Sequence, residues 1–149
     1  MSAPGLALDA PRTKLAVDVV QSETLPMKNP EHIVLMRQAV RERAIQQGLS
    51  LVDQTKIVTA ASELARNTLD YGGGGAVEIE VLNGARRGVR LLFEDQGPGI
   101  KDVEVAMRDG FSTGSGLGLG LGGAKRLCSE FSIESALGSG TRVSCARWK

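Results

Sequence analysis

Three segments of the chain alternate apolar and polar residues, and this alternation limits the folds that the chain can adopt. Segment 76–82 alternates valine and isoleucine with glutamate, and segments 88–95 and 141–148 follow a similar pattern. A doubly wound parallel sheet is covered on both faces, so its strands read as apolar throughout. Strands with one apolar face instead predict an α/β two-layer sandwich, with helices packed on one face of the sheet. A Rossmann-type fold is therefore disfavoured.

Helical periodicity and turn residues predict the other elements. The patterns indicate a strand over 15–20, a break from Pro26 to Pro30, helices over 31–47, from the Ser50 cap to Gly72, over 103–108 and from within 116–120 to about Phe131, and closing strands over 132–137 and 141–148. Segments 76–82 and 88–95 form a hairpin around Asn83-Gly84. We expect residues 1–13 to form a loose tail and residues 14–149 to form a single domain.

Composition argues against several classes of partner. The 18 basic and 17 acidic side chains nearly cancel, and only five aromatic residues are present, so a nucleic-acid surface is not expected. No apolar run is long enough to span a membrane, and the first residues lack a secretion signal. Cys128 and Cys145 fit no metal-ligand spacing and are interpreted as small buried thiols, with a redox pair as the alternative. We expect a cytoplasmic protein.

Glu63 and Asn67 are the first candidate site residues. They are four positions apart on a predicted helix, so their side chains share one face. A carboxylate there can accept a proton from an attacking hydroxyl, and an amide oxygen can bind Mg²⁺. The alternative is a pair of polar residues facing solvent. The small neighbours Ala60, Ala61 and Ala65 favour the functional interpretation, because small side chains leave room for a ligand.

Asp95 follows the apolar parity of its strand, so its carboxylate is expected on the covered face of the sheet. A buried carboxylate needs a hydrogen-bond donor, and the exocyclic amine of adenine is such a donor. Guanine has an oxygen at that place, so ATP is favoured over GTP. Gly97 and Gly99 would let the backbone approach the base closely. The alternative is that Asp95 is a turn residue ahead of Gly97-Pro98-Gly99.

A second glycine cluster, Gly116, Gly118 and Gly120, precedes a predicted helix. Backbone amides at a helix start can bind phosphate groups. The alternative, a flexible linker, is disfavoured because leucines alternate with the glycines. Thr141 shares the strand parity of Val143, so it either faces the same pocket or belongs to a simple hairpin turn.

Taken together, these motifs resemble the GHKL ATP-binding superfamily, which includes gyrase, Hsp90, histidine kinases and MutL. Within it, the chain is similar to the small serine/threonine kinases of bacterial partner-switching stress responses, including stressosome switch kinases, which are related to anti-sigma kinases. The similarity covers about residues 31–149 and is densest in segments 52–54, 63–67, 95–100, 109–113 and 123–127. It implies a Bergerat fold, in which helices pack on a mixed sheet and hold ATP and Mg²⁺ between the layers.

The resemblance also implies roles for the site residues. Glu63 would be the catalytic base, Asn67 the magnesium ligand, Asp95 the adenine acceptor, Gly97 and Gly99 the walls of the adenine pocket, Gly116, Gly118 and Gly120 the phosphate-binding segment, and Thr141 a neighbour of the adenine. No Lys or Arg lies between Asp109 and Ala124, so Arg108 and Lys125 are the candidates for a phosphate contact. With so little positive charge at the phosphates, slow turnover is expected.

Finally, the resemblance implies the partners. The substrate would be a Ser or Thr of a STAS-domain antagonist or scaffold protein, and phosphorylation would release the kinase to bind a PP2C-type phosphatase or another output regulator. The alternative is a nucleotide-dependent anti-sigma factor or binding module, which sequesters a sigma factor or other regulator with little kinase activity.

Overall fold

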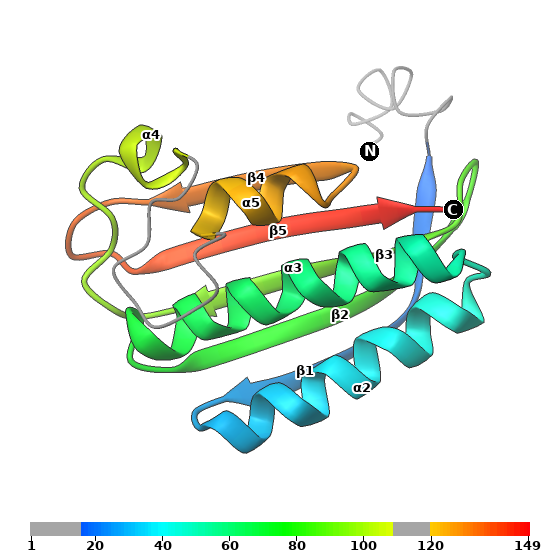
Figure 1. The fold of residues 1–149 in the computed structure, drawn as a ribbon, viewed down its shortest axis with the longest axis horizontal. Coiled ribbons are helices and arrows are strands. Elements are labelled where there is room, and N and C mark those ends of the chain that lie inside the picture. The colour runs from blue at the N-terminus through cyan, green and yellow to red at the C-terminus, as the bar shows by residue number, and fades with distance from the viewer. Residues whose placement is uncertain (1–15, 109–119) are drawn as a thin grey trace, which may run out of the picture.

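A computed structural model describes residues 16–108 and 120–149 of the chain. The elements in chain order are β1 (Val17–Met27), α2 (Pro30–Gln46), α3 (Leu51–Asp70), β2 (Gly75–Gly84), β3 (Gly88–Asp95), α4 (Val103–Ala106), α5 (Gly120–Arg126), β4 (Glu130–Ser135) and β5 (Thr141–Trp148). The strands form one sheet in the order β1-β2-β3-β5-β4, and α2, α3 and α5 cover one of its faces (Figure 1). The predicted two-layer α/β sandwich is confirmed.

All four strand pairings are antiparallel, where the family resemblance implied a mixed sheet. The β2–β3 and β4–β5 connections are hairpins, which join antiparallel strands directly. Strand β5 then lies beside β3 rather than beside β2, so the C-terminal hairpin extends the sheet on the side away from β1.

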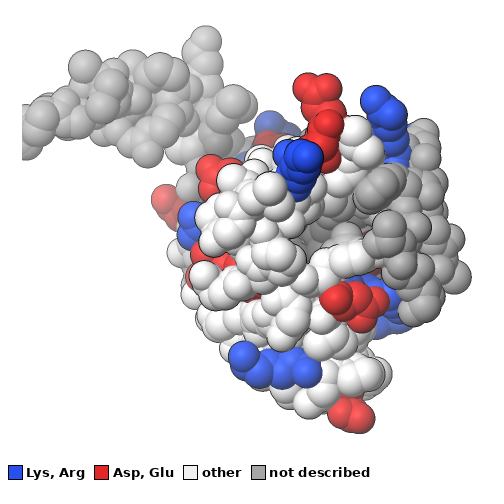
Figure 2. Space-filling model, turned by 90° about the vertical axis from the view of Figure 1, so that its left-hand side faces the viewer, with Lys and Arg blue, Asp and Glu red and all other residues white. Residues whose placement is uncertain are grey.

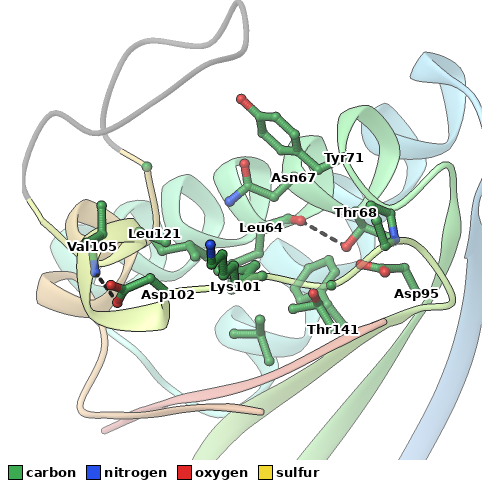
Figure 3. Close-up of a pocket in the computed structure, with 17 residues that line it drawn as sticks. Leu64, Asn67, Thr68, Tyr71, Asp95, Lys101, Asp102, Val105, Leu121 and Thr141 are labelled. Carbon is green, nitrogen blue, oxygen red and sulfur yellow. Dashed lines mark hydrogen bonds between the residues drawn. The ribbon is translucent and has the colours of Figure 1, made fainter. Parts of the chain in front are cut away.

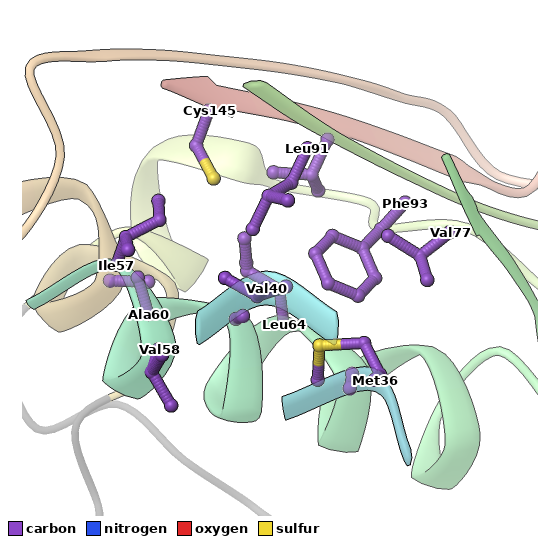
Figure 4. Close-up of a cluster of buried hydrophobic side chains, with 14 of the residues drawn as sticks. Met36, Val40, Ile57, Val58, Ala60, Leu64, Val77, Leu91, Phe93 and Cys145 are labelled. Carbon is purple, nitrogen blue, oxygen red and sulfur yellow. The ribbon is translucent and has the colours of Figure 1, made fainter. Parts of the chain in front are cut away.

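The apolar core lies between the helices and the sheet. Met36 and Val40 of α2 and Leu64 of α3 pack toward Phe93 and Cys145 of the sheet, and all five side chains are buried (Figure 4). Full burial of a large apolar side chain contributes about 1.5–3 kcal/mol. These contacts fix α3, which carries Glu63 and Asn67, against the middle of the sheet.

The opposite face of the sheet carries ion pairs. The Arg90 Nε–Glu80 Oε1 distance is 2.6 Å, and the Arg142 Nε–Glu94 Oε2 distance is 3.7 Å. These residues alternate with core residues along β2, β3 and β5, as the parity of the sequence predicts. The one-sided pattern therefore assigns each strand face correctly.

The start of α3 is fixed by two contacts of one turn. Ser50 is the N-cap, and its Oγ accepts a hydrogen bond of 3.1 Å from the Asp53 backbone N–H, which confirms the predicted cap. Asp53 Oδ1 also accepts from Arg147 of β5, at 2.7 Å from Nη2 and 3.1 Å from Nε. The Arg147 guanidinium holds the pKa of Asp53 below its usual value. Asp53 thus ties the helix start to the sheet.

Two predicted boundaries are wrong. The strand predicted over 15–20 and the break predicted at Pro26–Pro30 both end β1 too early, because β1 runs to Met27 and Pro26 within it pairs with Ala76. An edge strand tolerates proline, since one of its sides needs no N–H donor. The last long helix ends at Arg126 rather than near Phe131. After a short turn the Ser129 N–H donates to Ala146 O at 2.8 Å, and this bond draws the chain into β4.

The two cysteines meet in space although they are far apart in the sequence. Cys145 is buried in β5, as predicted, whereas Cys128 is half-buried in the turn after α5 rather than in the predicted helix. A hydrogen bond between the thiols lowers the pKa of Cys128 and raises that of Cys145. Both thiols are free.

Among the described residues, no helix combines the length and apolar character needed to cross a membrane. The tail predicted for residues 1–13 lies outside the described residues.

Candidate nucleotide-binding site

A cavity of about 400 Å³ opens between α3, the end of β3, α4 and the start of α5. The end of the molecule where these elements meet is visibly hollowed (Figure 2). Its lining is mostly apolar with a few polar groups, which is typical of small-molecule sites. The lining residues are Leu64, Asn67, Thr68, Tyr71, Phe93, Asp95, Pro98, Gly99, Ile100, Lys101, Asp102, Val105, Ala106, Gly120, Leu121, Thr141 and Val143. Of the predicted site residues other than glycines, Asn67, Asp95 and Thr141 line the cavity, and Glu63 does not.

Asp95 lies at the end of β3 and is only 7% exposed. Its Oδ1 accepts a hydrogen bond of 2.9 Å from the Gly97 N–H. No group of the described chain donates to Oδ2, and the side chain borders the cavity beside Thr68 (Figure 3). A buried carboxylate oxygen with no donor is costly unless a ligand supplies one. Asp95 is therefore both a turn residue, through Oδ1, and an acceptor available to a ligand, through Oδ2.

The glycines after Asp95 are needed for contacts within the chain. A Cβ at Gly97 would lie 2.7 Å from the Gly72 Cα, and Gly97 does not itself line the cavity. Gly99 does line the cavity, has φ +80°, and would place a Cβ 2.0 Å from Ala136 O. Both positions therefore require glycine even without a ligand, a reason that the sequence did not reveal.

Gly72 determines the position of Asp95. A Cβ on Gly72 would lie 2.3 Å from the Asp95 Cγ and 2.4 Å from Oδ2. The sequence indicates Gly72 only as the residue that ends α3. Because the two residues are far apart in the chain, only the packing of α3 against β3 reveals that Gly72 leaves space for the carboxylate.

Glu63 and Asn67 lie one turn apart on α3 and differ in their surroundings. Asn67 lines the cavity, and its side-chain amide has no hydrogen-bond partner among the described residues (Figure 3). Glu63 does not line the cavity; it is 4% exposed, and its Oε2 lies 3.1 Å from Arg66 Nη1. The free amide oxygen of Asn67 is a suitable hard ligand for Mg²⁺.

The small residues of α3 do not leave room for the ligand. Ala60, Ala61 and Ala65 are buried in the core, and none of them lines the cavity. Their size instead allows α3 to pack closely on the rest of the fold. The space for a ligand lies one turn further along, beside Leu64, Asn67 and Thr68.

The second glycine cluster is described only in part. Gly120 begins α5, lines the cavity and has φ +61°. Gly116 and Gly118 lie outside the described residues. Thr141 borders the cavity near Asp95, so it faces the pocket rather than serving only as a turn residue. Its Oγ1 also lies 2.8 Å from the Ser135 Oγ.

Lys101 is a site residue that the sequence interpretation missed. It lines the cavity, and its ammonium group forms no ion pair within the described part of the chain (Figure 3). The predicted phosphate contacts, Arg108 and Lys125, are exposed and do not line the cavity. Lys101 directly follows Gly97-Pro98-Gly99-Ile100 in the sequence. A residue that follows a motif at the edge of the cavity is itself placed near the cavity, and this position could have indicated Lys101.

Comparison of the chain with known proteins agrees with the fold and the cavity. Residues 52–149 match the histidine kinase-, DNA gyrase B-, and HSP90-like ATPases, and the chain belongs to this family. It is 49% identical over 117 residues to the serine/threonine-protein kinase RsbT of Bacillus subtilis, covering 78% of this chain and 88% of that protein. The expected relationship to small switch kinases, and with it the class of protein serine/threonine kinase, is confirmed.

More distant relatives are of two kinds. An anti-sigma F factor of a Thermoanaerobacter species is 28% identical over 117 residues, covering 75% of this chain and 82% of that protein. Two solved structures share the fold: the RsbU and RsbW domains of Mycobacterium tuberculosis Rv1364c (TM-score 0.59, 24% identity, 86% of this chain and 31% of that chain) and the Pseudomonas aeruginosa SiaB-SiaC complex (TM-score 0.52, 12% identity, 100% of both chains). They support the sandwich fold.

Proposed function

We propose that the chain transfers the γ-phosphoryl group of ATP to a Ser or Thr of a partner protein, with Glu63 as the base and Asn67 as the magnesium ligand. The observation that carries this proposal is that Asn67 and Glu63, one turn apart on α3, have different surroundings. Asn67 faces the cavity, whereas Glu63, one turn earlier, is buried without lining it and keeps one carboxylate oxygen free. A base that serves a hydroxyl from another protein belongs beside the nucleotide rather than in contact with the adenine or ribose.

The donor groups of the cavity fit ATP and Mg²⁺. Asp95 Oδ2 would accept from the adenine amine, and the Asn67 amide oxygen would hold Mg²⁺. The bound ion would neutralise phosphate charge. Lys101 would add a second positive charge along the cavity, and Gly120 would let the backbone approach the phosphates. Glu63 would then take the proton of the partner hydroxyl as its oxygen attacks phosphorus.

The proposed partner is a STAS-domain antagonist or scaffold protein. The kinase name of the Bacillus subtilis relative and the presence of a second protein in the SiaB-SiaC complex favour a protein substrate. Release after phosphorylation would free the kinase to bind a PP2C-type phosphatase or another output regulator in the cytoplasm.

A second candidate function is that of an anti-sigma factor or binding module. The 28% identity to an anti-sigma F factor, over 82% of that protein, favours it. In that case the same cavity would hold nucleotide, and the chain would sequester a sigma factor with little phosphorylation. Retention of Glu63 favours the kinase, because binding alone needs no base.

A radiolabelled phosphotransfer assay tests the proposal. The chain would be mixed with Mg-ATP and a candidate STAS-domain protein, and the variants Glu63→Gln and Asn67→Ala would be compared with Glu80→Gln. Glu80 is a suitable control, since it is also buried and paired with an arginine but lies on the opposite face of the sheet. Label that appears on the partner, is lost in the first two variants and persists in the third supports the roles.

Two results would count against the kinase. Transfer at full rate by Glu63→Gln refutes the base assignment. A stable, nucleotide-dependent complex with a sigma factor and no label on any partner favours the binding module.

A further inference from the structure

The carboxylate of Glu63 is held by one side chain. Its side chain is 6% exposed, and Arg66 Nη1 lies 3.1 Å from Oε2. Within residues 16–108 and 120–149, Arg66 is the one group that bonds to this carboxylate, so Oε1 has no donor. A buried carboxylate without a partner is costly, because it loses its hydration and gains nothing in return. The Arg66 contact is therefore what orients the Glu63 carboxylate.

The position of Arg66 connects this contact with the cavity. Arg66 follows Glu63 by three residues on α3, a spacing that brings side chains together on a helix. It directly precedes Asn67, which lines the cavity, and its own side chain is 33% exposed. The guanidinium thus lies between the buried carboxylate and solvent, one residue before a side chain that lines the cavity.

We propose that Arg66 is a positioning residue for phosphoryl transfer, holding Glu63 by Oε2 so that Oε1 receives the substrate proton. This inference rests on the function proposed above. In the step, the partner hydroxyl gives its proton to Glu63 Oε1, and its oxygen forms a bond to the γ-phosphorus of ATP. The bond from that phosphorus to the bridging oxygen breaks, and ADP leaves with the bond's electron pair. Arg66 itself exchanges no proton.

The chemistry of arginine suits this task. A guanidinium is planar and presents its N–H donors in a rigid fork, so the Nη1 donor that contacts Oε2 has a fixed direction. A lysine ammonium keeps the charge but not the fork. Misplacement of a reacting group by about 1 Å can cost about 100-fold in rate. Loss of Arg66 should therefore slow the chemical step and leave nucleotide binding intact.

The chain offers a matched control. Arg90 is also 33% exposed and contacts a mostly buried glutamate, Glu80, with a 2.6 Å distance from Nε to Oε1. That pair lies on the opposite face of the sheet from α3. Arg90→Ala therefore removes a comparable ion pair and measures the purely structural cost of doing so.

The experiment compares Arg66→Ala, Arg66→Lys and Arg90→Ala with the unaltered chain, using labelled ATP and a phosphorylatable partner. We expect kcat of Arg66→Ala to fall about 10- to 100-fold while the Kd for ATP stays within about twofold. Arg66→Lys should recover part of the rate, and millimolar guanidinium ion should raise the rate of Arg66→Ala alone. Arg90→Ala should retain full kcat.

The outcomes separate this inference from the proposed function. A full rate in Arg66→Ala, or a loss confined to ATP affinity, overturns the positioning role. The positioning role is also overturned if Arg66→Ala and Arg90→Ala lose kcat to the same extent and neither Arg66→Lys nor guanidinium ion restores it. If the unaltered chain transfers no label to a partner, the proposed function fails, and the role of Arg66 fails with it.

Discussion

Replacing Asp95 by asparagine should weaken ATP binding strongly while preserving the fold. In the structure one carboxylate serves two demands: Oδ1 accepts from the Gly97 N–H at 2.9 Å, and Oδ2 borders the cavity. An asparagine has the same shape but only one acceptor oxygen. If that oxygen keeps the Gly97 contact, an NH₂ group faces the adenine amine, and two donors meet. If the amide rotates, the Gly97 N–H loses its partner.

The magnitude follows from the single hydrogen bond that is lost in either orientation. A hydrogen bond to a charged group contributes about 1.5–3 kcal/mol. Since 1.4 kcal/mol corresponds to a tenfold change in affinity, the Kd for ATP should rise by about 10- to 150-fold. GTP should lose less, because guanine has an oxygen where adenine has the amine. The preference for ATP over GTP should therefore narrow.

Calorimetric titration with ATP and GTP would measure both affinities, and thermal unfolding would check the fold. Glu94→Gln is the control, since Glu94 is the neighbouring carboxylate in β3 but its side chain is 55% exposed on the other face of the sheet. Its ATP affinity should match that of the unaltered chain. An Asp95→Asn variant that unfolds normally and binds ATP within about twofold of the unaltered chain would refute the assignment of Oδ2 to adenine.

Two further variants test the surroundings of the site, and a third tests the contact that fixes the start of α3. Gly72→Ala should weaken ATP binding about tenfold in the same titration, because its Cβ would lie 2.3 Å from the Asp95 Cγ and displace the carboxylate; unchanged affinity would contradict this. Lys101→Met should weaken ATP binding about fivefold and make it less dependent on salt, but leave adenosine binding unchanged. Equal losses of affinity for ATP and adenosine would show that Lys101 does not contact the phosphates. Asp53→Asn should lower the free energy of unfolding by about 1 kcal/mol at pH 7 in urea titrations. Arg147 lowers the folded-state pKa of Asp53, so its stabilising effect is present above the unfolded pKa of about 3.9 and fades as pH falls through the folded value; a difference that persists well below that pH would exclude the ion pair as its cause.

The sequence predicts those parts of the fold that depend on local pattern. Strand parity assigns the core and open faces of β2, β3 and β5, and the Ser50–Asp53 contact predicts the start of α3. Boundaries that depend on tertiary contacts are not predicted. Pro26 continues β1 because β1 is an edge strand, and α5 ends early because Ser129 bonds to Ala146. Neither cause is visible in a window of neighbouring residues.

The same distinction holds for the site. Asn67, Asp95 and Thr141 could be assigned to one cavity because motif spacing and strand parity fix the side on which each of them lies. Gly72 could not, since its role depends on how α3 approaches β3. Lys101 was missed although it directly follows a motif that borders the cavity. Gly97 and Gly99 were predicted from their role toward a ligand, but contacts with the backbone of the chain also require them. The presence of these glycines alone therefore does not prove nucleotide binding.

The arrangement of α3 also explains how one fold could serve both candidate functions. Asn67 faces the cavity, whereas Glu63, one turn earlier, forms an ion pair with Arg66. If Glu63 and Arg66 have the roles proposed above, changes at either residue would remove phosphoryl transfer without altering the groups that would bind nucleotide. In a protein that regulates by exchanging partners, such a change would leave nucleotide-dependent complexes intact but deprive them of the covalent step that ends them. With the roles proposed above, a kinase and a sequestering module of this fold would differ in this ion pair rather than in the fold or the cavity.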